Sequence, residues 1–285
     1  MKKLISLLLC ILLLSGCAET YDGPTVSKSV CTVMEIETYN PDGSISQNIR
    51  EEYAYDIYGN RSQVLSWYDD DPYEKSILRY DDEGRLLRSD TCDAGSWLPF
   101  PRYTYIYTYD DQGRMTSTTN RYRREKSTTT VTYDDEAKTR TTTAYGGVTV
   151  EYLNEQGWVL RSEQDLTNGS TVLTEFDRRP DGKPLAYRSY EDGILISETV
   201  ITYDDQGRIL TQTEIKDGIS TLLFSFEYGE DYEKRTDSDG ALTVIQYHPD
   251  GTMDCQVRYD ESDRLQSMTR YHYTEIQVPA KEAIP

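Results

Sequence analysis

The chain has 285 residues and a formal net charge of −20 at pH 7, because 50 Asp and Glu residues outnumber 30 Lys and Arg residues. So acidic a surface repels nucleic acid and anionic lipid headgroups, which argues against partners of either kind bound through general electrostatics. The length allows a sizeable hydrophobic core in one domain or two.

Residues 1–16 are predicted to be a signal peptide. Lys2 and Lys3 precede an apolar run that ends at Leu14 and is too short to span a bilayer as a stable helix. The sequence Leu-Ser-Gly-Cys ending at Cys17 resembles the lipobox of bacterial lipoproteins. By that resemblance, Cys17 is lipidated as the first mature residue and holds the protein on an extracytoplasmic membrane surface. A plain secretory signal or a retained anchor is the alternative.

The sequence divides the mature chain into three parts. Residues 17–33 comprise the lipidated Cys17 and a small, polar, aperiodic segment, which predicts a flexible tether. Residues 34–273 carry strand and turn patterns with no internal linker, which predicts a single β domain. Residues 274–285 contain Pro279 and a terminal Pro, so we expect a loosely packed tail.

A six-residue phrase, Tyr-Asp-x-x-Gly-Arg, recurs along the predicted domain. The aromatic residue is expected to end a strand, the Asp to accept backbone N–H groups, and the Gly to close a type I turn with a bulge. The chain then reverses into the next strand. The strongest matches are Tyr55-Asp56 with Gly59, Tyr80-Asp81 with Gly84-Arg85, Tyr109-Asp110 with Gly113-Arg114, Tyr203-Asp204 with Gly207-Arg208, and Tyr259-Asp260 with Arg264. Weaker forms begin at Tyr39, Tyr133, Tyr152, Phe176, Tyr228 and Tyr247.

A second family of turns lies between these phrases, as in Asn168-Gly169 and Asp217-Gly218. Asn-Gly and Asp-Gly pairs between strand residues are typical of hairpins. The apolar residues of the flanking segments alternate with period two, which indicates strands rather than helices. Two turn families predict an all-β antiparallel meander of about 20 strands, which must curl because open twisted sheets seldom exceed about ten strands.

Tyrosine is the dominant aromatic residue, with 25 copies against four Phe and three Trp. In the segment 102–109, Tyr103, Tyr105 and Tyr107 are expected on one face of a strand. They could form a binding face for sugar rings or a peptide. The other interpretation is a cross-strand aromatic ladder that only stabilises the sheet.

One basic cluster, Arg121 to Lys126, stands out in this acidic chain. It could dock an acidic partner or a phosphate-rich polymer. The alternative interpretation is a solvated hairpin tip.

The sequence contains no recognisable catalytic motif, and we predict no catalytic residues, cofactor or metal. His248 and His272 lie in unrelated contexts. The Asp pairs could bind calcium, but the Arg nearby disfavours a cation, so we predict turn capping instead. The widely spaced Cys31, Cys92 and Cys255 allow one disulfide and a free thiol, or three incidental cysteines.

The Tyr-Asp-x-x-Gly-Arg units, as in Tyr80 to Leu86, resemble the YD repeat of the RHS family, which occurs in bacterial polymorphic toxins, wall-associated proteins and teneurins. The resemblance covers most of the mature chain and implies a spiral β-sheet that works at the cell surface. It supplies no catalytic residues. With about eleven units, no Asp-Pro-x-Gly core box and no room for a toxin domain after Tyr273, encapsulation of a toxin is not expected.

The sequence therefore predicts a non-catalytic lipoprotein of the bacterial cell envelope, with a YD-repeat scaffold that binds a glycan or protein partner or has a structural role. One alternative is an extracytoplasmic enzyme acting on polysaccharide, which requires convergent carboxyl groups with raised pKa in a cleft. Another is an accessory or remnant of a polymorphic toxin system.

Overall fold

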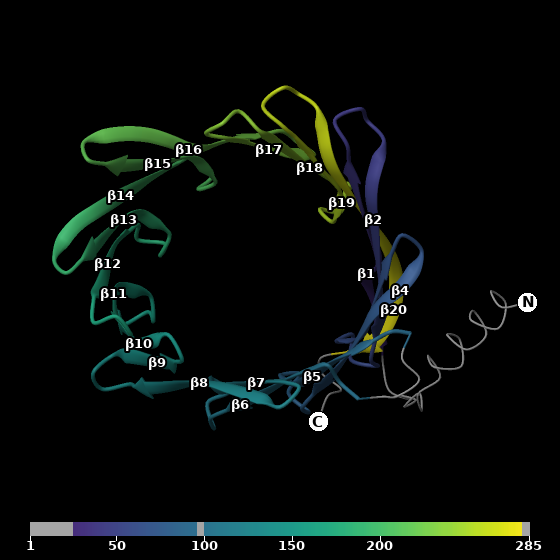
Figure 1. Cartoon of the computed structure of the whole chain (residues 1–285), viewed down its shortest axis with the longest axis horizontal. Helices are drawn as coiled ribbons and strands as arrows, with labels where there is room; N and C mark the ends of the chain where they lie inside the picture. The colour runs from purple at the N-terminus through teal and green to yellow at the C-terminus, as the bar shows by residue number, and fades with distance from the viewer. Residues whose placement is uncertain (1–24, 96–99, 281–285) are drawn as a thin grey trace, which may run out of the picture.

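The computed structural model describes residues 25–95 and 100–280, and within these ranges the chain forms twenty β-strands and no helix (Figure 1). The predicted all-β antiparallel meander is confirmed. The strands are β1 (Thr25–Tyr39), β2 (Ile45–Tyr55), β3 (Arg61–Tyr68), β4 (Asp71–Tyr80), β5 (Leu86–Asp93), β6 (Tyr103–Tyr109), β7 (Met115–Tyr122), β8 (Glu125–Asp134), β9 (Thr139–Ala144), β10 (Gly147–Leu153), β11 (Val159–Leu166), β12 (Thr171–Arg178), β13 (Pro184–Glu191), β14 (Ile194–Tyr203), β15 (Ile209–Lys216), β16 (Ile219–Tyr228), β17 (Tyr232–Asp237), β18 (Leu242–Tyr247), β19 (Met253–Tyr259) and β20 (Leu265–Pro279).

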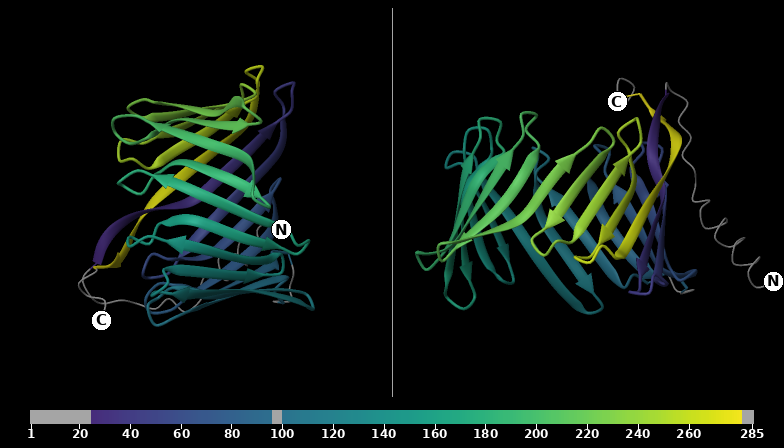
Figure 2. Two further views of the ribbon diagram at one scale, coloured as in Figure 1. Left: turned by 90° about the vertical axis from the view of Figure 1, so that its left-hand side faces the viewer. Right: turned by 90° about the horizontal axis from the view of Figure 1, so that it is seen from above.

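The sheet closes on itself instead of winding as a spiral. Each strand pairs antiparallel with the next along the chain, and β20 returns to pair with β1 between Thr25↔Pro279 and Thr38↔Ser267. Every strand therefore has two neighbours, and the strands surround a central axis as a closed barrel (Figures 1 and 2). A barrel of this many strands is too wide for its side chains to fill. Among the described residues, no large side chain is completely buried.

The two rims of the barrel carry different turns. The even-numbered strands from β2 to β18 end at one rim, which we call the Tyr-Asp rim because most of the repeated phrases lie there. The other rim, the hairpin rim, carries the turns that follow the odd-numbered strands. Because β1 is antiparallel to β2, it begins at the Tyr-Asp rim, and β20 ends there beside it (Figure 2).

Each Tyr-Asp turn is held by its first carboxylate. In the turn after Tyr109, Asp110 Oδ1 accepts the backbone N–H groups of Gln112 (3.0 Å) and Arg114 (2.8 Å). Asp110 Oδ2 accepts the Nε–H of Arg114 at 2.8 Å, and Gly113 has a φ of +78°. The same three side-chain contacts recur at Asp81, Asp204 and Asp260. The first Asp of each phrase therefore caps the turn.

Neighbouring Tyr-Asp turns are linked through Tyr and Arg. The Tyr109 hydroxyl donates to the Leu86 carbonyl (2.8 Å), which follows the preceding Tyr-Asp turn. The Arg85 guanidinium of that turn lies 5.2 Å from the centre of the Tyr109 ring. Corresponding hydroxyl contacts are made by Tyr80 to Arg61, Tyr133 to Met115, Tyr203 to Pro184 and Tyr228 to Ile209. Each turn thus supports the next around the rim.

Two of the weaker phrases were assigned to the wrong residues. At Tyr152 and Phe176 the strands run on, and Leu153 and Arg178 occupy the position that Tyr takes in other turns. Arg178 Nε donates to the Val159 carbonyl at 2.7 Å and so replaces the usual Tyr hydroxyl. The prediction chose the nearest aromatic residue, Tyr152 or Phe176, as the end of the strand. The strand instead ends at the residue directly before the turn, whether or not that residue is aromatic.

Tyr39 and Tyr259 end odd-numbered strands, so their turns lie at the hairpin rim rather than the Tyr-Asp rim. The Tyr259 turn keeps the carboxylate cap through Asp260. Asp263, with a φ of +60°, stands where the other phrases have Gly.

The predicted ends of the domain were also wrong. Residues 25–33, assigned to the tether, belong to β1, and residues 274–279, assigned to the tail, belong to β20. These segments are extended because they pair with each other along the closing seam. Cys31, Cys92 and Cys255 are all free thiols. Cys17 and the predicted signal peptide lie outside the described residues.

We predict that Asp204→Ala destabilises the barrel whereas Asp205→Ala does not. The first substitution removes an acceptor for the Gln206 and Arg208 backbone N–H groups and for Arg208 Nε. Asp205 is exposed and accepts no hydrogen bond among the described residues. Thermal unfolding should show a midpoint several degrees lower for Asp204→Ala and little change for the control. Equal midpoints would contradict the capping role.

The capped carboxylates also predict acid sensitivity. The Arg208 backbone N–H, helped by its guanidinium and opposed by partial desolvation, holds the pKa of Asp204 below its ordinary value of 3.8. The Arg264 backbone N–H and guanidinium lower the pKa of Asp260 in the same way. A carboxyl group with a lowered folded pKa stabilises the protein above its unfolded pKa, and this contribution disappears as the pH falls through the folded value.

The free energy of unfolding should therefore decline as the pH drops below about 4. The double variant Asp204→Asn, Asp260→Asn should decline less between about pH 6 and pH 3, as measured by denaturant unfolding at each pH. Parallel curves for variant and parent would show that other carboxyl groups control the acid transition.

Candidate functional site

The predicted tyrosine face lies on β6. Because β6 is a regular strand, Tyr103, Tyr105 and Tyr107 share one face of the sheet. On β7 they lie opposite Tyr122, Asn120 and Thr118. All three tyrosines are half-buried.

The contacts made by the tyrosines of β6 change along the strand from one rim to the other. At the Tyr-Asp rim, Tyr109 ends β6 and its hydroxyl is used in the turn contact to Leu86. Partial burial, with the neighbouring Tyr105 and Tyr109, raises the pKa of Tyr107, so its hydroxyl remains a hydrogen-bond donor at neutral pH. In the middle, the Asn120 side chain donates to the Tyr105 hydroxyl at 3.5 Å.

At the hairpin rim, the row ends in a stacked pair. The rings of Tyr103 and Tyr122 lie 4.7 Å apart with an interplanar angle of 16°. The Arg102 guanidinium lies 5.3 Å from the centre of the Tyr103 ring, and Arg123 lies 5.2 Å from that of Tyr122. Sequence reasoning missed this group because Tyr122 and Arg123 come from the neighbouring strand and its turn. Their place inside the basic cluster Arg121 to Lys126 was the available signal.

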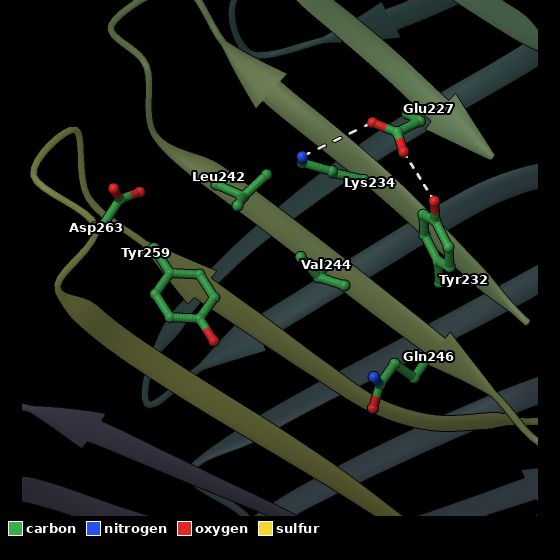
Figure 3. Close-up of a pocket in the computed structure, with 8 residues that line it drawn as sticks. All are labelled: Glu227, Tyr232, Lys234, Leu242, Val244, Gln246, Tyr259 and Asp263. Atoms are coloured by element: carbon green, nitrogen blue, oxygen red, sulfur yellow. Dashed lines mark hydrogen bonds and ion pairs between the residues drawn. The ribbon is translucent and has the colours of Figure 1, made fainter. Parts of the chain in front are cut away.

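The hollows of the sheet are shallow, and in the first of them Glu227 is already paired. Figure 3 shows one of about 480 Å³, lined by residues of β16 to β19. Within it, Tyr232 donates to Glu227 at 2.8 Å, and Lys234 Nζ lies 3.7 Å from the same carboxylate. A second hollow of about 590 Å³ lies between the Tyr-Asp turns of Tyr203 and Tyr228.

The structure brings the two histidines together, which their sequence contexts did not suggest. A hollow of about 350 Å³ is lined by His248 and His272, with Asp250, Asp254 and Arg270. His248 Nε2 lies 3.5 Å from Asp254, and His272 Nε2 lies 3.3 Å from Glu35 on β1. No short segment could have shown this, because the histidines approach through the pairing of β19 with β18 and β20, and closure of β20 onto β1 adds Glu35.

Across residues 25–95 and 100–280, each carboxyl group whose pKa departs from its ordinary value has a lowered pKa. The same ranges contain no group of three His, Cys, Asp or Glu residues able to hold a metal ion.

In the part of the chain that the structure describes, no helix is long and apolar enough to cross a membrane.

No protein-family model and no curated protein matches the chain. Among solved structures, TcdB2-TccC3-TEV is 15% identical with a TM-score of 0.37, and the match covers 84% of this chain. This chain spans only 15% of the length of that one. A porin-like protein from Bacteroides uniformis is 11% identical with a TM-score of 0.43, covering 88% of this chain and 99% of the other. TM-scores below 0.5 assign neither a family nor a function.

Proposed function

We propose that this protein is a non-catalytic lipoprotein of the bacterial cell envelope, with an RHS/YD-repeat sheet that binds a glycan or protein partner. The observation that carries the proposal is the row of tyrosines on β6, which reaches the hairpin rim as the stacked pair Tyr103 and Tyr122. Such rings offer large apolar area and a polar hydroxyl, which suits sugars and peptides.

The predicted lipid at Cys17 would orient the barrel. β1 begins at Thr25, eight residues after Cys17 (25 − 17 = 8). A fully extended chain of that length spans at most about 29 Å. The lipid would therefore hold the Tyr-Asp rim close to the membrane, and the hairpin rim would face away from it. In this orientation the stacked tyrosines are accessible to envelope polymers.

A structural envelope role is the second candidate. It is favoured by the Tyr-Asp rim, where Tyr hydroxyls and Arg side chains connect successive turns. Such a rim stiffens the barrel without any ligand.

Lipidation predicts that Cys17→Ser moves the protein from the membrane fraction to the soluble fraction of the producing cells. The change removes the only sulfur atom that the lipobox resemblance assigns to the lipid. Fractionation combined with incorporation of a labelled fatty acid measures the effect, and Cys31→Ser is the matched control. If Cys17→Ser still incorporated the labelled fatty acid at the parent level, the prediction that Cys17 carries the lipid would be wrong.

Partner binding predicts that residues 18–285, immobilised and exposed to a glycan array and to envelope extract, retain one glycan or protein saturably. Replacing Tyr103, Tyr105 and Tyr107 by Ala should abolish retention while circular dichroism shows that the sheet survives. Tyr58→Ala, at an exposed turn on the Tyr-Asp rim, is the control. No retention from either source would refute the binding proposal and favour the structural role.

A further inference from the structure

Four cations and a single acid, Glu125, gather at one hairpin tip of the hairpin rim. The cations are Arg121 at the end of β7, Arg123 and Arg124 in the turn, and Lys126 on β8. All four are exposed, and none forms an ion pair with a residue in the described ranges. Arg102 beside them differs, because it lies 3.5 Å from Asp93 and 3.9 Å from Glu74.

The cluster destabilises the hairpin that carries it. Arg121 and Lys126 are directly paired across β7 and β8, where like charges repel. Arg123 has a φ of +53°, whereas Arg124 does not have positive φ. A two-residue hairpin turn with positive φ at its first central position favours Gly there. Two other two-residue tips of the hairpin rim follow the usual chemistry, with Asp192-Gly193 and Asp217-Gly218.

Departures from local turn chemistry tend to mark functional positions. Here the departure lies in a tip of net charge +3 (four cations and Glu125), on a chain whose net charge is −20. It also places Arg123 over Tyr122, which stacks on Tyr103. Aromatic rings and two guanidinium groups without an ion pair in the described ranges therefore meet at one tip of the hairpin rim, where Glu125 is the single acid.

We propose that this tip, together with the stacked Tyr103 and Tyr122, binds an anionic polysaccharide. The apolar face of a sugar packs against the exposed parts of the tyrosine rings. The carboxylate, sulfate or phosphate group of the sugar pairs with Arg123 or Arg124 in the turn, and the fork of an Arg side chain suits such groups. The inference rests on the proposed binding function and names the chemistry of its ligand.

Other polyanions fit this surface less well. A nucleic acid carries a charge on every nucleotide and needs a long positive groove, whereas this cluster occupies a single hairpin. An anionic bilayer lying across the hairpin rim would also meet acidic tips at Asp69 to Asp71 and Glu191-Asp192. A polysaccharide can present a few charges to the tip and extend away from the acidic body.

The test compares residues 18–285 with the variant Arg123→Gly, Arg124→Ser. Three immobilised anionic polysaccharides serve as probes: polygalacturonate for carboxylate, dextran sulfate for sulfate and a phosphomannan for phosphate. Methyl-esterified polygalacturonate is the neutral match, and polyglutamate and single-stranded DNA represent the other polyanions. Lys216→Gln, which removes an exposed cation from another tip of the hairpin rim, is the control variant.

We expect saturable binding to at least one anionic polysaccharide, weakened by added salt. The variant should bind about tenfold more weakly, because each exposed charge contributes modestly and two are lost. Its thermal unfolding midpoint should be equal or higher, because Gly relieves the turn, so lost binding cannot be attributed to unfolding. The control should bind like the parent.

The inference is overturned if none of the three polymers binds, or if the neutral ester, polyglutamate or DNA binds as tightly. It is also overturned if the variant binds like the parent. These results can be distinguished from failure of the proposed function. Retention of another glycan or protein that depends on Tyr105 and Tyr107 but not on Arg123 would leave partner binding intact and exclude only this site.

Discussion

The barrel depends on the contacts that link each Tyr-Asp turn to the next. An Asp carboxylate closes its own turn, as Asp110 does, and the Arg of the phrase both pairs with that Asp and lies over the following Tyr. The Tyr hydroxyl then binds a backbone carbonyl beside the preceding turn. In a single-layered sheet whose described residues include no completely buried large side chain, little stability can come from a packed core. Hydrogen bonds and cation–π contacts along the rim compensate for this.

This arrangement explains what the sequence could predict. Turn chemistry is local, so six residues around Asp110 or Asp204 suffice to predict where a strand ends and the next begins. Period-two alternation gives the strands and places Tyr103, Tyr105 and Tyr107 on one face. Ring closure could not be predicted, because the pairing of Thr25 with Pro279 joins residues 254 positions apart (279 − 25 = 254). The errors at both domain ends follow from that one unseen pairing.

The remaining errors arise where position matters more than residue type. Arg178 performs the contact of a Tyr, so a search for aromatic residues selects Phe176 instead. The surroundings of the candidate site are also set by neighbours across strands. Tyr122 stacks on Tyr103 because of the β6–β7 register, and His272 meets Glu35 because the ring closes. Register between distant strands is not encoded in any short segment.

The same contacts explain why the two rims differ in how well they tolerate sequence changes. On the Tyr-Asp rim, the hydroxyl, carboxylate and guanidinium groups are occupied by their neighbours, so a change at one turn disturbs the next. Some hairpin-rim turns, such as Asn168-Gly169, close within themselves, and exposed apolar side chains lie at several tips, including Tyr145, Ile194 and Ile219. These tips can change sequence without loosening the barrel. A charge cluster such as Arg121 to Lys126, which costs stability locally, is therefore tolerated on this rim and would be disruptive on the other.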